Sequence, residues 1–290
     1  MKFAFYPGCV AQGAARELKA STEALAKKLG IELVPMPNAT CCGAGVITEQ
    51  NPVLSNTLNA RTFAIAEKMG LDILNICGTC QGVMKKAQKE LKESPKKLEE
   101  ANKSMAGSGL EYRGKVKVRH LLNVLIEDIG ADKLKSMVRR PLKDLRIGAF
   151  YGCYALRPGE LSGLKDPDNP DEIENLVRAL GGEPVDYPGR LRCCGFPYVM
   201  MSKRNALTMA GNHISAAKEN GANCMVTPCP LCHLNLDPYQ PESAKIVGKE
   251  LNVPIFHLPQ MVGLALGISP KELQLSKHII RFKESLTQSR

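Results

Sequence analysis

The chain has 290 residues, of which 44% are hydrophobic and 23% are charged, so it is neither a disordered chain, a collagen-like fibre nor a coiled coil. Its net charge of +10 attracts anions such as acidic lipid, an acidic protein partner or a small anionic molecule. The chain has no Trp and shows no finger or helix-turn-helix pattern, so we expect no nucleic-acid partner. No apolar run approaches 18 residues, and the N-terminus lacks a signal peptide. We therefore expect a cytoplasmic protein with no transmembrane segment, whose membrane contact is at most peripheral and made through partner subunits.

The predicted elements alternate between β and α along the chain. In the first half, a strand, helix, strand, helix and strand are expected over residues 2–6, 14–29, 31–35, 54–69 and 72–76. In the second half, the same order is expected over residues 146–151, 171–180, 183–187, 203–219 and 223–227. Such alternation is typical of a parallel sheet flanked by helices. We predict an α/β fold of two pseudo-symmetric Rossmann-like halves, covering residues 1–140 and 141–290.

Three segments fall outside this pattern. Residues 93–115 carry charge pairs and glycines with little apolar periodicity, and they are predicted to link the halves. Residues 157–170 are a proline-containing insertion, expected to form an exposed loop beside the site. The chain from residue 270 onward is polar and basic, which predicts a surface helix or tail.

The cysteines are arranged as two copies of one pattern. Each half contains a single Cys, then a CCG segment, then a CxxC motif. The last four cysteines of the two copies are separated by 152 residues in each case. An odd count of eleven cysteines in a long chain argues against a secreted disulfide scaffold. Ordered, reduced thiols of this kind are more typical of metal ligands or redox groups.

The predicted strands bring these cysteines together. The single Cys and the CxxC motif each follow the carboxyl end of a strand, and the CCG segment follows the second strand. In open parallel sheets, binding sites form in the crevice outside those ends. We therefore expect the five cysteines of each half to converge, although they are spread over about seventy residues of sequence.

Thiolates are soft ligands that suit zinc, copper(I) and iron–sulfur clusters. Zinc and a cubane cluster each need four ligands, whereas each half offers five. Adjacent side chains on an extended backbone point apart, so the two cysteines of a CC pair bind different atoms of one cluster more easily than one metal ion. The pattern favours an unusual polynuclear iron–sulfur centre, and a zinc-binding structural module remains the alternative.

The two arrays resemble the CCG cysteine-rich domain found in the B subunit of heterodisulfide reductase and its relatives. The resemblance implies two noncubane [4Fe-4S] clusters that face one another. It implies that the first cluster is held by Cys9, Cys41, Cys42, Cys77 and Cys80. It implies that the second is held by Cys153, Cys193, Cys194, Cys229 and Cys232.

The resemblance also implies an activity. A disulfide, such as a heterodisulfide, would be reduced or formed between the clusters within a multi-subunit complex. The implied partners are a ferredoxin-like iron–sulfur subunit, like the C subunit of that enzyme, and a flavoprotein subunit, and the charge favours an anionic disulfide or thiol substrate. Relatives with this pattern also serve in unusual succinate or fumarate reductases. The alternative is therefore an electron-conducting subunit of a succinate/fumarate:quinone reductase.

Three histidines lie near these motifs. His120 and His257 occupy equivalent positions at the ends of β-type runs, and either could donate a proton to a departing thiolate. We favour, at roughly two to one, the alternative that each is a hydrogen-bonded residue at a strand end. His233 follows Cys232 directly and could donate a hydrogen bond to a cluster sulfur.

Other side chains near the motifs receive simpler predictions. Three arginines are candidates for contact with an anionic substrate: Arg157, Arg190 and Arg192. Three large side chains after the second CCG segment are expected in the core: Tyr198, Met200 and Met201. Cys224, the cysteine outside the repeat, is expected to be a small core residue.

Overall fold

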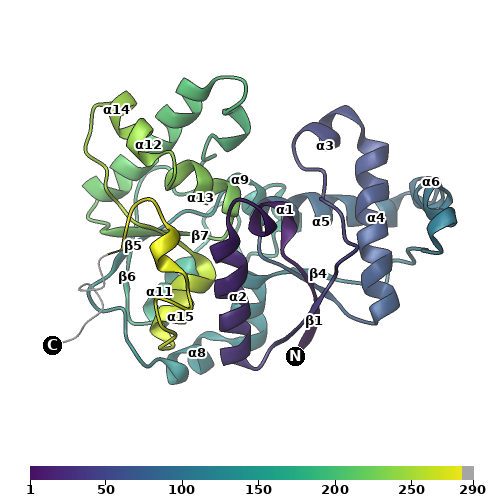
Figure 1. Cartoon of the computed structure of the whole chain (residues 1–290), viewed down its shortest axis with the longest axis horizontal. Coiled ribbons are helices and arrows are strands. Elements are labelled where there is room, and N and C mark those ends of the chain that lie inside the picture. The colour runs from purple at the N-terminus through teal and green to yellow at the C-terminus, as the bar shows by residue number, and fades with distance from the viewer. Residues whose placement is uncertain (283–290) are drawn as a thin grey trace.

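Two four-stranded sheets, parallel throughout, form the centre of the two halves (Figure 1). The computed structural model describes residues 1–282, and the statements below concern that range. The first sheet has the order β2-β1-β3-β4 and consists of β1 (Lys2–Tyr6), β2 (Glu32–Pro35), β3 (Ile73–Asn75) and β4 (Val118–His120). The second has the order β6-β5-β7-β8 and consists of β5 (Arg146–Ala149), β6 (Glu183–Val185), β7 (Cys224–Thr227) and β8 (Ile255–His257). The predicted α/β fold with two similar halves is confirmed.

The longer helices cover the faces of these sheets. In the first half they are α2 (Arg16–Leu29), α4 (Pro52–Met69), α5 (Gly78–Glu93) and α6 (Pro95–Met105). In the second half they are α11 (Glu172–Ala179), α12 (Lys203–Glu219), α13 (Pro230–Leu236), α14 (Gln240–Val247) and α15 (Leu258–Ala265). Local sequence sets their ends: the Asn51 side chain accepts a hydrogen bond from the Leu54 N–H at the start of α4, and Gly70 ends that helix with positive φ.

Shorter helices connect these elements. The α-helical ones are α1 (Gly8–Gln12), α3 (Val46–Gln50), α7 (Leu121–Asn123), α8 (Ala131–Met137), α9 (Cys153–Leu156) and α10 (Gly159–Ser162). A π-helical turn spans Val124–Ile129, and 3₁₀ turns span Ala106–Ser108, Phe196–Tyr198 and Leu275–Lys277. The predicted insertion at 157–170 is mostly exposed, as expected, and includes α10.

The two halves share a continuous core. Helix α2 of the first half packs against α15 of the second, and Leu18 and Leu25 are buried in the same cluster as Met261 and Leu264. The central strands are buried on both faces, which explains why they are apolar runs rather than alternating patterns. The carboxyl ends of the central strands of both sheets therefore meet near the junction of the halves.

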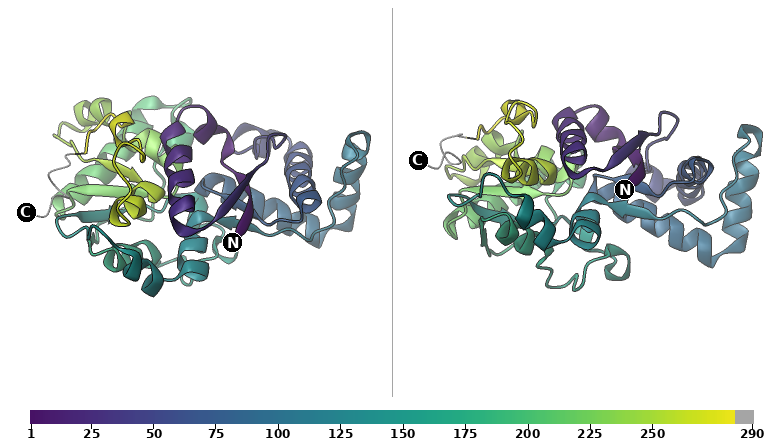
Figure 2. Two further views of the ribbon diagram at one scale, coloured as in Figure 1. Left: turned by 60° about the horizontal axis from the view of Figure 1, so that its bottom comes forward. Right: turned by 90° about the horizontal axis from the view of Figure 1, so that it is seen from below.

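The prediction that residues 93–115 link the two halves is wrong. Most of it forms α6, which packs against α4 and buries Ala101 and Met105. The segment then leads into β4, the last strand of the first sheet, so it lies within the first half. Figure 2 shows α6 at the end of the molecule furthest from the second half. The many Lys and Glu residues on its exposed face hid the narrow apolar stripe.

The prediction of a surface tail from residue 270 onward is only partly met. Leu273, Leu275 and His278 are buried against the second half. Residues 283–290 of this segment lie outside the described range. Among the described helices, none combines the length and the apolar character needed to cross a membrane.

Candidate metal centres

The five cysteines of the first half converge, as predicted. Cys9 lies in the first turn of α1, Cys41 and Cys42 follow β2, and Cys77 and Cys80 begin α5. The Sγ atoms of Cys9 and Cys41 are 3.6 Å apart, and those of Cys42 and Cys80 are 3.5 Å apart. The Cys80 N–H points at the Cys77 Sγ at 3.4 Å. We call this group the first quintet.

The second half repeats the arrangement. Its thiol contacts join Cys153 to Cys193, Cys194 to Cys232 and Cys229 to Cys232. Backbone N–H groups again face the paired sulfurs, because Gly195 and Phe196 donate to Cys193 and Cys194 at 3.4 Å. We call these five cysteines the second quintet.

Two glycines admit the sulfurs, and sequence reasoning did not single them out for this role. Gly8 and Gly152 directly precede the first Cys of each quintet, and both have φ of +79°. A Cβ at Gly8 would lie 3.1 Å from the Cys80 Sγ, and one at Gly152 would lie 2.8 Å from the Cys232 Sγ. Glycine is thus required both by the backbone conformation and by the close approach of a ligand sulfur.

The sulfur spacing of the first quintet, and the charge of one thiol in each quintet, fit metal binding. Two thiolates on one tetrahedral ion, with bonds of about 2.3 Å, lie about 3.8 Å apart. In the first quintet, the Sγ atoms of Cys9 and Cys41 are 3.6 Å apart and those of Cys42 and Cys80 are 3.5 Å apart, both close to this value. Hydrogen bonds from Cys42, Cys9 and the Gly43 N–H lower the pKa of Cys41, and those from Cys153, Cys194 and the Gly195 N–H lower the pKa of Cys193. The same hydrogen bonds, together with burial, raise the pKa of their partners Cys9 and Cys153, so one thiolate in each group is stabilised while its neighbour keeps its proton.

Three polar side chains hold the backbone of the CC pairs, and sequence reasoning missed this role. The Asn59 side chain of α4 donates to the Cys42 carbonyl at 2.9 Å. The Asn235 side chain of α13 donates to the Cys194 carbonyl at 2.6 Å, and the Nε2 of His213 in α12 lies 2.9 Å from the Cys193 carbonyl. These contacts come from helices distant in sequence, so no local motif signals them.

The two quintets lie against each other at the junction of the halves. The Thr79 hydroxyl, between the cysteines of the first CxxC motif, lies 3.3 Å from the Cys229 Sγ of the second quintet. The Gly78 N–H donates to the Pro228 carbonyl at 3.2 Å. The two cysteine groups therefore lie next to each other, as predicted, and they make contact through their CxxC motifs.

His120 joins the halves at this same place. Its Nδ1 accepts a hydrogen bond from the Leu122 N–H, so the neutral ring carries its proton on Nε2. That Nε2 donates to the Pro228 carbonyl of the other half at 3.1 Å. Burial lowers the pKa of His120 to about 4, which keeps the ring neutral. Both nitrogens are thus occupied by hydrogen bonds, and the one made by Nε2 joins the two halves.

A small cavity of about 130 Å³ opens beside the second quintet. Both halves form its walls, and each contributes an equivalent pair of residues, Ala44–Gly45 from the first and Phe196–Pro197 from the second. The sulfur-bearing wall residues all belong to the second quintet: Cys153, Cys194, Cys229 and Cys232. None of the wall residues in the described part of the chain carries a charged side chain.

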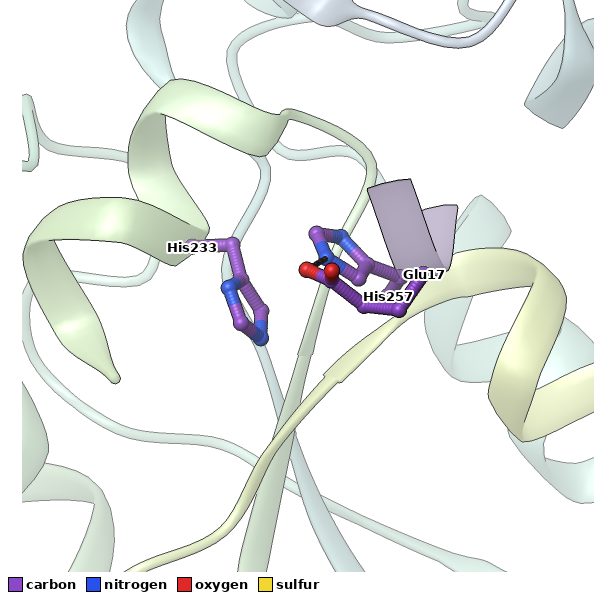
Figure 3. A group of neighbouring side chains, drawn as sticks. All are labelled: Glu17, His233 and His257. Atoms are coloured by element: carbon purple, nitrogen blue, oxygen red, sulfur yellow. Dashed lines mark hydrogen bonds and ion pairs between the residues drawn. The ribbon is translucent and has the colours of Figure 1, made fainter. Parts of the chain in front are cut away.

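His257 lies in a buried group of polar side chains away from this cavity. Its Nε2 lies 3.1 Å from the carboxylate of Glu17, which comes from α2 of the first half (Figure 3). His233 stacks on the His257 ring at a centroid distance of 3.8 Å. His278 lies edge-on to His233, with 2.9 Å between its Nδ1 and the His233 Nε2. Neither His120 nor His257 is among the described residues that line the cavity.

The other predicted side chains are found in varied settings. Arg190 pairs with Glu174 at 3.0 Å, and Arg157 pairs with Asp168 at 2.7 Å. Neither these two arginines nor Arg192 is among the described cavity-wall residues. Cys224 is fully buried in β7, as predicted for a core residue. The core prediction is wrong for three residues, which are exposed: Tyr198, Met200 and Met201.

Comparison with known proteins places this arrangement in a family. The model of the cysteine-rich domain CCG matches residues 3–85 and again residues 147–237. The chain is 41% identical over 279 residues to the 8-methylmenaquinol:fumarate reductase membrane anchor subunit of Wolinella succinogenes, covering 96% of this chain and 97% of that one. It is 32% identical over 290 residues to the B subunit of the ferredoxin/F(420)H(2)-dependent CoB-CoM heterodisulfide reductase of Methanosarcina acetivorans, covering 99% and 96%.

A solved structure of a hypothetical protein from Helicobacter pylori shares the fold. The two match with a TM-score of 0.81 at 15% identity. The match covers 97% of this chain but only 52% of the other, so this chain spans about half of that protein. With two quintets, two matches to the CCG domain and full-length relatives at 30% identity or more, the chain belongs to the family of duplicated CCG cysteine-rich domain proteins that includes the B subunit of heterodisulfide reductase.

Proposed function

We propose that the chain is the electron-transferring subunit of a multi-subunit oxidoreductase and holds one noncubane [4Fe-4S] cluster in each quintet. The observation that carries the proposal is the meeting of ten cysteines in two groups whose CxxC motifs touch, beside a cavity walled by both halves. The clusters would supply one-electron transfer, and two of them suit a partner that takes or gives two electrons.

The chain's own residues support this assignment. The five thiols of each quintet exceed the four that zinc or a cubane cluster requires. The paired spacings near 3.5 Å join different sulfurs of the CC segment to different neighbours, as a polynuclear centre requires. Backbone N–H groups facing the sulfurs stabilise their negative charge.

A quinone or quinol is the first candidate for the two-electron partner. The cavity walls combine Phe196, Pro197, Tyr154, Ala155 and Leu231 with no charged side chain among the described residues. An uncharged ring therefore loses little solvation in this cavity, whereas an anion would find no counter-charge. The Wolinella succinogenes relative is named for 8-methylmenaquinol and fumarate. The complex would then couple a dicarboxylate flavoprotein to quinone.

A disulfide is the second candidate. The cavity adjoins four thiols of the second quintet, which places a bound disulfide next to sulfur ligands. Methanosarcina relatives are named as heterodisulfide reductase subunits. The part of a disulfide that contacts these walls would have to be uncharged. This differs from the anionic substrate that the net charge of the chain suggested.

The partner subunits would be a ferredoxin-like iron–sulfur subunit and a flavoprotein. Cys9 and Cys41 of the first quintet are exposed, whereas the second quintet has no exposed cysteine in the described structure. The first quintet is therefore the more accessible place for a protein partner to exchange electrons.

Metal analysis tests the assignment directly. The protein is purified anaerobically, and iron, acid-labile sulfide and zinc are measured per chain. We expect about eight iron atoms and negligible zinc, because two clusters contain four iron atoms each. About two zinc ions with negligible iron would instead establish the zinc-binding structural module and end the cluster proposal.

An activity assay distinguishes the two substrate candidates. The purified complex is assayed anaerobically with a panel of quinones and a panel of disulfides, using a chemical electron donor or acceptor. We expect turnover with quinones and little with charged disulfides. Turnover restricted to disulfides would replace the quinone assignment with the second candidate.

A further inference from the structure

Exposed large apolar side chains are concentrated in two segments of the described chain. Eight such residues are found, and six of them follow the CCG segments of the two halves. These six are Val46, Val53, Leu54, Tyr198, Met200 and Met201, and we call them the CCG rim. Met200 and Met201 are 95% and 81% exposed, so they contribute almost nothing to the core. Single exposed apolar residues are ordinary, but a concentration of this kind marks a contact surface.

The CCG rim adjoins the cavity-wall residues of both halves along the chain. Val46 and Tyr198 are equivalent positions, separated by the same 152 residues as the CCG cysteines. Each directly follows a pair of cavity-wall residues, Ala44–Gly45 or Phe196–Pro197. Helices α3 and α12, which carry or follow the two parts of the rim, lie on the same side of the molecule, at the top of Figure 1. The exposed side chains of both segments therefore come after residues that line the cavity.

Basic side chains accompany the rim in the second half. Arg204, in the first turn of α12, is exposed and closely follows Met201. Lys203 beside it is also exposed, and its ammonium group pairs with the Glu242 carboxylate at 2.7 Å. A tyrosine and flexible aliphatic side chains beside lysine and arginine are typical of segments that lie in the interfacial region of a membrane. The net charge of +10 adds attraction to anionic lipid.

We propose that the CCG rim docks on the surface of a lipid bilayer, so that the cavity receives an uncharged quinone ring from the acyl chains. This inference rests on the quinone-linked function proposed above. A relative over the full chain is named a membrane anchor subunit, yet no described helix of this chain can span a bilayer. Attachment would then use a surface, and the rim holds six of the eight exposed large apolar side chains of the described chain. A planar lipid surface also accommodates two separate projections, whereas a protein partner would need a matching groove for each.

Vesicle binding tests the docking surface. The full chain, with its clusters, is sedimented anaerobically with vesicles of phosphatidylethanolamine and phosphatidylglycerol. Two double variants remove the rim from one half each: Met200→Ser with Met201→Ser, and Val46→Ser with Val53→Ser. We expect about tenfold or greater loss of binding in each, because two apolar side chains no longer enter the interface. Ile279→Ser is the matched control, since Ile279 is 56% exposed elsewhere, and it should bind like the unchanged protein.

Three results would overturn the docking proposal. The first is a chain that does not sediment with vesicles. The second is equal binding by the rim variants and the unchanged protein, which would indicate adsorption by charge alone. The third is vesicle binding that requires added partner subunits, which would make the rim a protein interface.

A second assay separates this proposal from the proposed function. The rim variants and the unchanged protein are assayed with a water-soluble quinone that lacks an isoprenoid tail. We expect equal rates, because the quintets and the cavity are intact, and a lower rate for the variants only with a long-tailed quinone in vesicles. If the unchanged protein turns over neither quinone, the quinone-linked function fails, while vesicle binding still decides whether the rim docks on lipid.

Discussion

Adjacent cysteines in each CCG segment have different neighbours. Cys41 lies against Cys9, whereas Cys42 lies against Cys80. In the second half, Cys193 contacts Cys153 and Cys194 contacts Cys232. The two thiols of each CC pair also contact each other, so the pair connects two further sulfurs of its quintet. These separate contacts of the two cysteines favour a polynuclear centre over a single metal ion.

Cys42→Ser tests the role of the fifth thiol. Oxygen is a poor substitute for sulfur on iron, so the electron paramagnetic resonance or Mössbauer spectrum of the first cluster should change while the far-ultraviolet circular dichroism stays the same. Cys194→Ser should do the same to the second cluster. Cys224→Ala is the matched control, because that buried cysteine has no role in either quintet. Unchanged spectra in both CC variants would contradict the five-thiol assignment.

His278→Asn tests the buried histidine group through pH. Burial lowers the pKa of His278 to about 4, below its value of about 6.5 in the unfolded chain. The unfolded state therefore binds the proton first, and stability present above pH 6.5 is lost as the pH falls toward 4. Between pH 7.5 and 5.5 the free energy of unfolding should fall by about 1 kcal/mol more in the unchanged protein than in the variant. Equal pH dependence in denaturant titrations would show that His278 does not titrate in this way.

In each half, the helix that follows the third strand positions the two sulfurs of the CxxC motif at its N-terminus. Cys77 and Cys229 are the residues directly before α5 and α13, and each has an extended backbone. Cys80 and Cys232 then lie in the first helical turn, one turn from their partners. The preceding strands, β3 and β7, are central in their sheets, so these helix starts face the junction of the halves.

Gly152→Ala tests the close approach of strand end and helix. The added Cβ would lie 2.8 Å from the Cys232 Sγ, so we expect the second quintet to lose iron, with about half the iron of the unchanged protein remaining. Gly130→Ala is the control, because its φ of +82° and ψ of +152° are close to those of Gly152 (+79° and +147°), with no atom within 4 Å of the added Cβ. The control should lose about 1–3 kcal/mol of stability through backbone strain and keep its full iron content. Equal iron loss in both variants would indicate general unfolding instead.

The whole molecule behaves as one unit because contacts cross between the halves. The shared core joins α2 to α15, and His120 and Gly78 both donate to the Pro228 carbonyl. The halves are similar but not equivalent: the first quintet reaches the surface, and the cavity adjoins the second. The two quintets of the duplicated chain therefore differ in their access to solvent and to the cavity.

Glu17→Ala tests one contact between the halves. The Nε2–H of His257, fully buried, donates to the Glu17 carboxylate, and its removal leaves that donor without a partner. We expect the free energy of unfolding to fall by about 1–3 kcal/mol. Glu17→Gln keeps an accepting oxygen and should cost less than half as much. Equal losses in the two variants, measured by denaturant unfolding, would show that the hydrogen bond contributes little.

The sequence alone was sufficient for much of this protein. The repeated order of the cysteines predicted the duplication. Alternating β and α patterns predicted both sheets, because strands buried on both faces must be apolar and their helices amphipathic. Cysteine spacing predicted the membership of each quintet, since the loops at the carboxyl ends of parallel strands lie together. The linker prediction failed because α6 buries only a few residues, and a narrow stripe such as Ala101 and Met105 is easily hidden by surrounding charges.

Only the tertiary structure decided how the two quintets meet, which groups hold them and what surrounds the cavity. The Gly8 and Gly152 requirements, the Asn59 and Asn235 hydrogen bonds and the exposure of the CCG rim all depend on which segments pack against one another. A local sequence pattern indicates whether a residue suits a strand, a helix or a set of metal ligands. It does not indicate which surface a side chain contacts, because contacts between residues far apart in the chain depend on the complete packing of both halves.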